Sequence, residues 1–188
     1  MKSIIISIFF ISGFIQLHAQ TLTGRIIHEG RTRVCNVKID LLDADQIVIG
    51  TTMTNEEGDY SIDLPDDGDG YSIFVGKEDE GEFLNGLSTF DIVLMKQHIL
   101  GIQILDDPQL IQAADLNNSN SLTVTDLLIV RNLILGITVE TEVPNWLFSR
   151  TNGGPANTDN LFQLNGNTVF NMIAYKRGDI DFSADPCR

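Results

Sequence analysis

Apolar and polar residues alternate along residues 21–78, and this period of two predicts short β-strands with one buried face. The alternation is visible in five stretches, namely residues 23–27, 37–41, 47–51, 60–64 and 71–75. Turn-forming residues such as Asp, Asn and Gly fill the gaps between the stretches. Short strands at this spacing predict a small antiparallel β-sandwich over residues 20–78.

The period changes to that of a helix after residue 90. Apolar residues between Asp91 and Leu100 predict one helix, and those between Leu127 and Leu135 predict another. Gly101 and Gly136 follow these runs, and glycine is the residue best suited to the end of a helix.

The two helical stretches are copies of one unit, offset by 35 positions. With this offset Leu87 aligns with Leu122, Asp91 aligns with Asp126, and the residues of 99–102 align with those of 134–137. A lone helix of about 12 residues is marginal in water. We therefore expect the two units to pack their apolar faces against each other.

The last 50 residues have weaker patterns. Residues 146–148 and 168–175 look like strands, and we expect residues 139–188 to form a β-rich segment that packs back against the earlier domains. The predicted fold class is α+β, with a small antiparallel β-sandwich followed by a duplicated loop–helix module and this C-terminal segment. The expected boundaries are 1–19, 20–78, 79–138 and 139–188.

Residues 1–19 have the features of a secretory signal peptide. Lys2 precedes a run of twelve apolar positions from Ile4 to Ile15, and Ala19 is a small residue at the expected cleavage point. Such a run is too short for a hydrocarbon core of about 30 Å. We expect a mature chain that is secreted, extracellular or at the cell surface, without a transmembrane segment.

The net charge and the absence of catalytic motifs exclude several classes of function. The chain has 12 Lys and Arg against 26 Asp and Glu, a net charge of −14, which disfavours binding to nucleic acid. His28 and His98 have no partners at catalytic spacing, and the sequence contains no phosphate-binding loop, nucleophile elbow or zinc-protease motif. The dense acidic residues between Asp43 and Glu82 fit a solvated face better than a glycosidase pair. We expect a protein that is not an enzyme.

A twelve-residue stretch before the second helix, residues 115–126, has the spacing of a calcium loop. Calcium takes six to eight hard oxygen ligands, and a tightly curled loop turns alternate residues inward. The residues expected to bind calcium are Asp115, Asn117 and Ser119 through their side chains, Ser121 through its carbonyl, Thr123 through water, and Asp126 as a bidentate ligand. With two carboxylates the affinity should be modest, about 10⁻⁴–10⁻³ M.

The first copy of the loop is degenerate. Counting back from Asp91 places Glu80 at loop position 1 and Leu84 at position 5. The loop either holds calcium through Glu80, Asn85, Ser88 and Asp91, or is an acidic loop without an ion.

Cys35 and Cys187 are the only cysteines. In an exported chain an even number favours a disulfide bond between them, worth about 4–5 kcal/mol for so long a loop. Two separate thiols are the alternative.

The stretch ADLNNSNSLTVTDLLIVRNLILG, residues 114–136, resembles a type I dockerin, and NGLSTFDIVLMKQHILG, residues 85–101, resembles its weaker copy. The hairpin around residues 54–62 is similar to that of carboxypeptidase-regulatory-like and transthyretin-like modules, and the combination is similar to architectures of secreted Bacteroidetes proteins. In this resemblance Gly178-Asp179-Ile180-Asp181 is the closing segment.

The resemblance implies a calcium-ordered module that attaches to a cohesin-like or other extracellular protein during polysaccharide breakdown. The partner-binding positions that it implies are Val124, Thr125, Arg131 and Asn132 in one copy and Thr89, Phe90, Lys96 and Gln97 in the other. A carbohydrate-binding accessory module with structural calcium is the alternative function, and a hydrolase fragment is the third.

Overall fold

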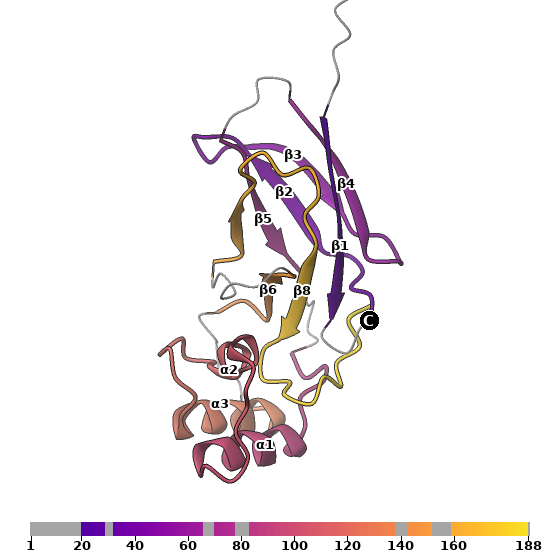
Figure 1. Cartoon of the computed structure of the whole chain (residues 1–188). Coiled ribbons are helices and arrows are strands. Elements are labelled where there is room, and N and C mark those ends of the chain that lie inside the picture. Colours follow the sequence, from indigo (N-terminus) through magenta and orange to yellow (C-terminus); the bar gives the residue numbers. More distant parts are fainter. Residues whose placement is uncertain are drawn as a thin grey trace, which may run out of the picture.

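The computed structural model describes residues 20–28, 32–65, 70–77, 83–137, 143–151 and 159–187. Within these ranges the chain is mostly β, with two four-stranded sheets and three short helices at one end of the molecule (Figure 1). The α+β composition is therefore confirmed. The predicted signal peptide, residues 1–19, lies outside the described ranges.

The first sheet has the strand order β4-β1-β8-β6. Its strands are β1 (Gln20–His28), β4 (Asp59–Leu64), β6 (Trp146–Arg150) and β8 (Met172–Lys176). Neighbours are antiparallel except for β1 and β8, which run parallel with Ile26 opposite Met172.

The second sheet has the order β3-β2-β5-β7 and is antiparallel throughout. Its strands are β2 (Lys38–Leu42), β3 (Val48–Met53), β5 (Ser72–Gly76) and β7 (Leu161–Gln163).

We had expected the sandwich to be complete at residue 78, but it is not. β6, β7 and β8 come from the C-terminal segment, and they pair with β1 and β5 of the N-terminal part. These pairings satisfy backbone groups that would otherwise lie at open sheet edges. The segment also provides large core side chains, with Trp146 and Phe148 at most 1 % exposed. The predicted packing back is thus part of the sandwich itself.

The core lies between the two sheets, where inward-facing side chains of both form one apolar cluster. Leu22 and Ile26 of β1 meet Ile39 of β2 and Ile73 of β5 in this cluster, and all four are fully buried. Alternation is clearest in β4, where Tyr60, Ile62 and Leu64 face the core, as the period of two predicts.

Both predicted helices are present, as α1 (Thr89–Ile99) and α3 (Val124–Ile134). Each is followed by a glycine with φ 67°, Gly101 or Gly136, which confirms the predicted ends. A third helix, α2 (Pro108–Ala114), was not predicted; it has proline at its start and Asp107 as its N-cap.

The helices form a second, smaller core. Met95 of α1 and Val130 of α3 are fully buried in one cluster with Leu110 of α2. The cluster joins the sandwich where β8 ends, since Gly178 N donates to Ala113 O at 3.0 Å and Arg177 Nη1 donates to Asp115 O at 2.8 Å. None of the helices in the described ranges has the length and apolar character needed to cross a bilayer.

Cys35 and Cys187 are joined by a disulfide bond. Of the two alternatives for these residues, the structure has the bridge, and it ties the C-terminal segment to the sandwich.

Candidate functional site

The loop before α3 is organised by Asp126, which is fully buried. Asp126 Oδ1 accepts hydrogen bonds from Leu116 N at 3.0 Å and Asn117 N at 3.2 Å, and its Oδ2 accepts from Thr123 N at 2.8 Å. One carboxylate therefore holds the start of the loop, the end of the loop and the first turn of α3 together.

The opposite side of the loop is organised by Asp115, which is 2 % exposed. Its Oδ1 accepts from Ser119 N at 2.9 Å and its Oδ2 from Asn120 N at 2.6 Å, while Ser119 Oγ donates to Ser121 O at 3.1 Å. Asn118 and Asn120 have φ of 53° and 62°, a left-handed backbone that asparagine tolerates better than most residues. The loop is curled so that its oxygen-bearing residues gather.

Thr123 also has a structural role that was not predicted. Its Oγ1 donates to Asp126 Oδ2 at 2.9 Å and accepts from Thr125 N at 3.3 Å, so it caps α3 and positions the carboxylate. The other predicted ligands are Asp115, Asn117, Ser119, Ser121 and Asp126, which are all hard oxygen donors of the kind that calcium takes. The residues present fit that cation.

The loop before α1 has the same hydrogen bonds but is built from two distant segments. Asp91, also fully buried, accepts at Oδ1 from Ile180 N at 2.7 Å and Asp181 N at 3.3 Å, and at Oδ2 from Ser88 N at 2.7 Å. Asp91 thus repeats the contacts of Asp126, but the first half of its loop comes from the segment after β8.

Asp179 repeats the contacts of Asp115 in the same way. Its Oδ1 accepts from Ser183 N at 3.1 Å, its Oδ2 from Ala184 N at 2.8 Å, and Ser183 Oγ donates to Gly86 O at 3.0 Å. We call this arrangement the split loop. Its positions 1, 3, 5, 7, 9 and 12 are Asp179, Asp181, Ser183, Gly86, Ser88 and Asp91.

The two halves of the split loop meet at Gly86. Gly86 has φ 80°, and a Cβ there would lie 2.7 Å from Ala184 Cβ and 2.7 Å from Asp179 Oδ2. Glycine allows both the left-handed backbone and the close approach. Leu87 and Leu122, which follow loop position 7 in each copy, both pack on the helix cluster.

Three carboxylates come together in the split loop. One oxygen from each of Asp91, Asp179 and Asp181 lies within 4.8 Å of the others. Burial raises the pKa of Asp91 above its ordinary value, with a further contribution from the charge of Asp179. Burial also works to raise the pKa of Asp179, but the contact with His28 and the backbone donors Ala184 and Ser183 outweigh it, so that this pKa is lowered.

The first predicted loop therefore needs correction. Glu80 lies outside the described residues, and Ser88 and Asp91 are in the split loop. Asn85 is not among its oxygens, because its side chain exchanges two hydrogen bonds with the backbone of Asp185. Counting back along the chain assumes a continuous loop, whereas the structure brings the first half from residues 179–184. The signal was present in Asp179, Asp181 and Ser183, which have the 1-3-5 spacing of residues 115–119.

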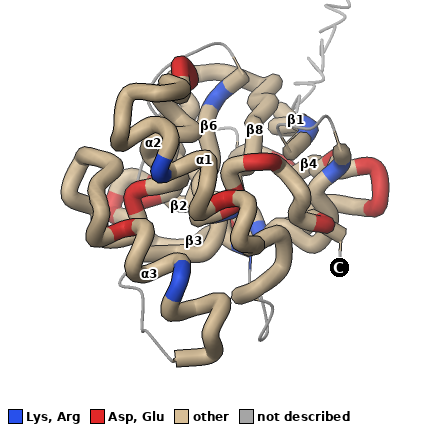
Figure 2. The backbone as a smooth tube through the Cα atoms, turned by 90° about the horizontal axis from the view of Figure 1, so that it is seen from below, with Lys and Arg blue, Asp and Glu red and all other residues tan. Residues whose placement is uncertain are grey.

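The predicted partner-binding positions lie on the faces of α1 and α3 that point away from Met95 and Val130. Phe90 is 54 % exposed and Val124 is 57 % exposed. Thr89, Lys96, Thr125 and Arg131 are also exposed, and Gln97 and Asn132 are intermediate. Figure 2 views this end of the molecule and shows basic positions as isolated segments among acidic ones.

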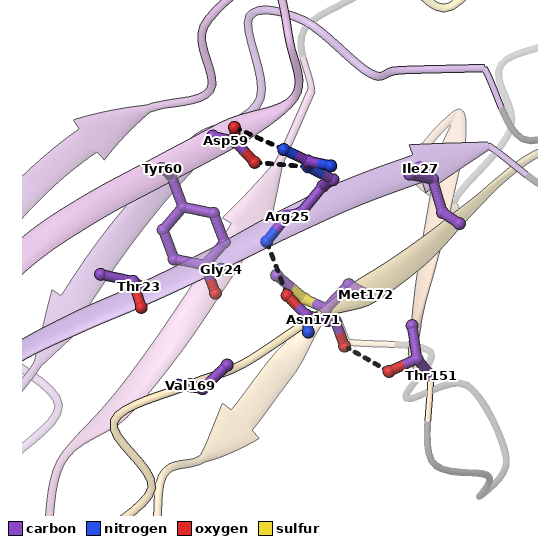
Figure 3. A pocket seen from close by; sticks show the side chains of 10 residues that line it. All are labelled: Thr23, Gly24, Arg25, Ile27, Asp59, Tyr60, Thr151, Val169, Asn171 and Met172. Atoms are coloured by element: carbon purple, nitrogen blue, oxygen red, sulfur yellow. Dashed lines mark hydrogen bonds and ion pairs between the residues drawn. The ribbon is translucent and has the colours of Figure 1, made fainter.

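A second feature is a groove of about 610 Å³ on the sandwich, shown in Figure 3. Arg25 and Asp59 form an ion pair at one side, with Arg25 Nη2 2.8 Å from Asp59 Oδ2, and Asn171 Oδ1 accepts from Arg25 N at 2.9 Å. Asp59 raises the pKa of Arg25, and Arg25 in turn lowers the pKa of Asp59. Tyr60 also lines the groove, but it is only 4 % exposed, and its hydroxyl donates to Phe170 O.

Comparisons with known proteins give no relative. No protein-family model matches the chain, and neither a curated protein nor a solved structure is significantly similar to it.

Proposed function

We propose that this chain is a secreted, non-catalytic, calcium-ordered attachment module that binds another extracellular protein. The observation that carries the proposal is the loop 115–126, in which Asp115 and Asp126 are both buried and each organises one side of the same curl. Two buried carboxylates in one loop are stable only when their charge is compensated. Arg177, whose charge interacts with that of Asp115, and the backbone donors of the loop compensate part of this charge, and bound calcium would supply the rest.

Asp126 connects the loop to the attachment surface. It is residue N3 of α3 and belongs to the capping box of that helix. A cation held by Asp115, Asn117, Ser119, Ser121 and Asp126 would therefore fix the loop and the start of α3 at the same time. The ordered helix then presents Val124 and Arg131 to solvent.

The exposed faces of α1 and α3 have the composition of a binding surface. Val93 and Leu128, at equivalent positions, are each 45 % exposed, and Lys96 and Arg131 lie one turn further on. Large apolar residues beside a single basic residue fit a protein partner better than a nucleic acid. The disulfide bond is typical of an oxidising compartment, which supports an extracellular setting. Polysaccharide breakdown at the cell surface is the setting that the dockerin resemblance implies.

Capture from the culture fluid of the source cells tests the proposal. The immobilised full chain should retain one or a few defined proteins in calcium and release them in chelator. A Val124→Asp/Leu128→Asp variant should lose them, while Val48→Asp, which places a charge on the equally exposed β3, should retain them. Capture that is independent of calcium, or equal in both variants with unchanged folding, would reject attachment through these helices.

Carbohydrate binding is the second candidate, and the groove at Arg25 favours it. The groove offers donors and acceptors from Arg25, Asp59 and Asn171, but Tyr60 is too deeply buried to stack on a sugar ring. Affinity electrophoresis on a glycan panel distinguishes the two functions. Retardation that is lost in Arg25→Ala and kept in Val124→Asp/Leu128→Asp would favour the carbohydrate.

A further inference from the structure

We infer that Arg177 holds a buried anion site, in which a single-atom anion of the halide type, such as chloride, binds between the end of β8 and the helix cluster. The site is separate from the loop 115–126, and its ion has the opposite charge to the one proposed there. The anion site and the proposed function can therefore each fail alone.

Arg177 is a buried cation with two unused donor nitrogens. It directly follows β8 and is 4 % exposed. Its Nη1 donates to Gln112 O at 3.1 Å and to Asp115 O at 2.8 Å, which caps the C-terminal end of α2. Its Nε and Nη2 are buried and have no hydrogen-bond partner among the described residues. These two nitrogens form one edge of the guanidinium fork, an edge suited to binding an anion.

The carboxylate of Asp115 does not satisfy this edge. Burial lowers the pKa of Arg177, and the charge of Asp115 works to raise it. The carboxylate oxygens of Asp115, however, accept from Ser119 N and Asn120 N, and it is the backbone carbonyl of Asp115 that accepts from Arg177. A guanidinium stays charged in proteins. Its two buried donors therefore cost free energy unless an acceptor binds to them.

Arg177 lines a small cavity, and with Nη1 turned to α2 the edge of Nε and Nη2 is the part left to face it. The volume of the cavity is about 10 Å³, which is room for one water-sized species. The other described residues that line it are Asn145 and five apolar residues, namely Phe83, Leu87, Leu116, Leu133 and Val143. Phe83 is 49 % exposed, so the cavity lies close to solvent.

The lining favours an anion over water. A water molecule that accepts from Nε and Nη2 still has two protons to donate, and the apolar side chains offer no acceptor for them. A halide only accepts, so it leaves no donor of its own unpaired. Its charge also compensates that of Arg177 in surroundings of low dielectric constant. A carboxylate or phosphate group is too large for a cavity of this volume.

A bound halide would join segments that are distant in the sequence. Leu87 precedes α1, Leu116 lies in the loop before α3 and Leu133 is in α3, and all three pack in the helix cluster. Arg177 belongs to the sandwich side, where its backbone N donates to Asn145 O at 2.8 Å next to β6. The anion would thus hold the helix cluster on the sandwich, and chloride should stabilise the whole chain.

Long-wavelength anomalous diffraction from crystals of the oxidised full chain, grown in sodium chloride, tests the inference without any variant. We expect one chloride peak within hydrogen-bonding distance of both Nε and Nη2 of Arg177. Density at this position without an anomalous signal would identify water and overturn the inference. A chloride peak in the crystal without any chloride effect in solution would be binding at crystal concentration only, which also overturns it.

Thermal unfolding measures the effect in solution. At about 0.15 M salt, with calcium acetate at one concentration, the wild type should melt about 2–4 °C higher in sodium chloride than in sodium methanesulfonate, whose anion is too large for the cavity. Arg177→Lys keeps the charge and can still donate to α2, but it lacks the second edge, so this difference should disappear. Arg33→Lys is the matched control, because the side chain of Arg33 is 61 % exposed, and it should keep the difference. Equal differences in all three proteins would overturn the inference.

Discussion

Asp91 of α1 accepts a hydrogen bond from Ile180 N at 2.7 Å, across a separation of 89 positions in the sequence. The equivalent bond in the other copy, from Leu116 N to Asp126, spans 10 positions. The same local structure is thus made once within a continuous loop and once between two distant segments. The helix pair is consequently tied to the sandwich through the end of the chain.

The loop 115–126 should bind calcium more tightly when position 3 carries a charge. That position is Asn117 here and Asp181 in the split loop. Asn117→Asp adds a carboxylate to the ligand set and keeps the oxygen that accepts from Ser119 N, so we expect calcium to bind about five- to tenfold more tightly. Calorimetry on Asn117→Asp, with Asn55→Asp in a remote turn as the control, measures this. Equal affinities in the wild type and Asn117→Asp would argue against Asn117 as a ligand.

Loss of the disulfide bond should affect the split loop more than the other loop. Cys35→Ser/Cys187→Ser releases the end of the segment that carries Asp179 and Asp181. We expect a loss of about 4–5 kcal/mol in the free energy of unfolding in the chain-entropy account. Amide hydrogen exchange should become faster only at the split loop, because half of that loop is then tethered at one end alone. A parallel rise in the exchange rates of both loops would contradict this coupling.

Gly86 should tolerate a side chain less well than Gly136 does. Both have a left-handed backbone, with φ of 80° and 67°, but only at Gly86 would a Cβ meet other atoms, 2.7 Å from Asp179 Oδ2. We expect Gly86→Ala to lower the free energy of unfolding by about 2–4 kcal/mol and Gly136→Ala by about 1 kcal/mol. Chemical denaturation of the two variants gives the comparison. Equal losses would show that the two halves of the split loop do not approach each other closely at Gly86.

Much of the fold could be predicted, because its signals are local. The alternation in residues 23–27 and 60–64 predicted β1 and β4, and the glycines at 101 and 136 marked the ends of α1 and α3. β7 has three residues, too few for a period to be visible, and α2 is a seven-residue helix that follows a proline. Neither leaves a clear pattern in the sequence.

The contacts between distant segments could not be predicted in this way. Periodicity identifies Trp146 and Phe148 as apolar positions of a strand but does not show that β6 pairs with β8 in the sheet of β1. The spacing of Asp179, Asp181 and Ser183 is that of half a loop, and only the fold shows that Asp91 completes it.

Amide hydrogen exchange with and without calcium tests the central claim most directly. In the oxidised wild type, peptides that cover residues 115–136 should exchange more slowly in calcium than in chelator, while peptides from β2 and β5 should be unaffected. Asn117→Ala/Ser119→Ala should abolish this difference in residues 115–126. Identical exchange of residues 115–136 in calcium and in chelator would contradict the account.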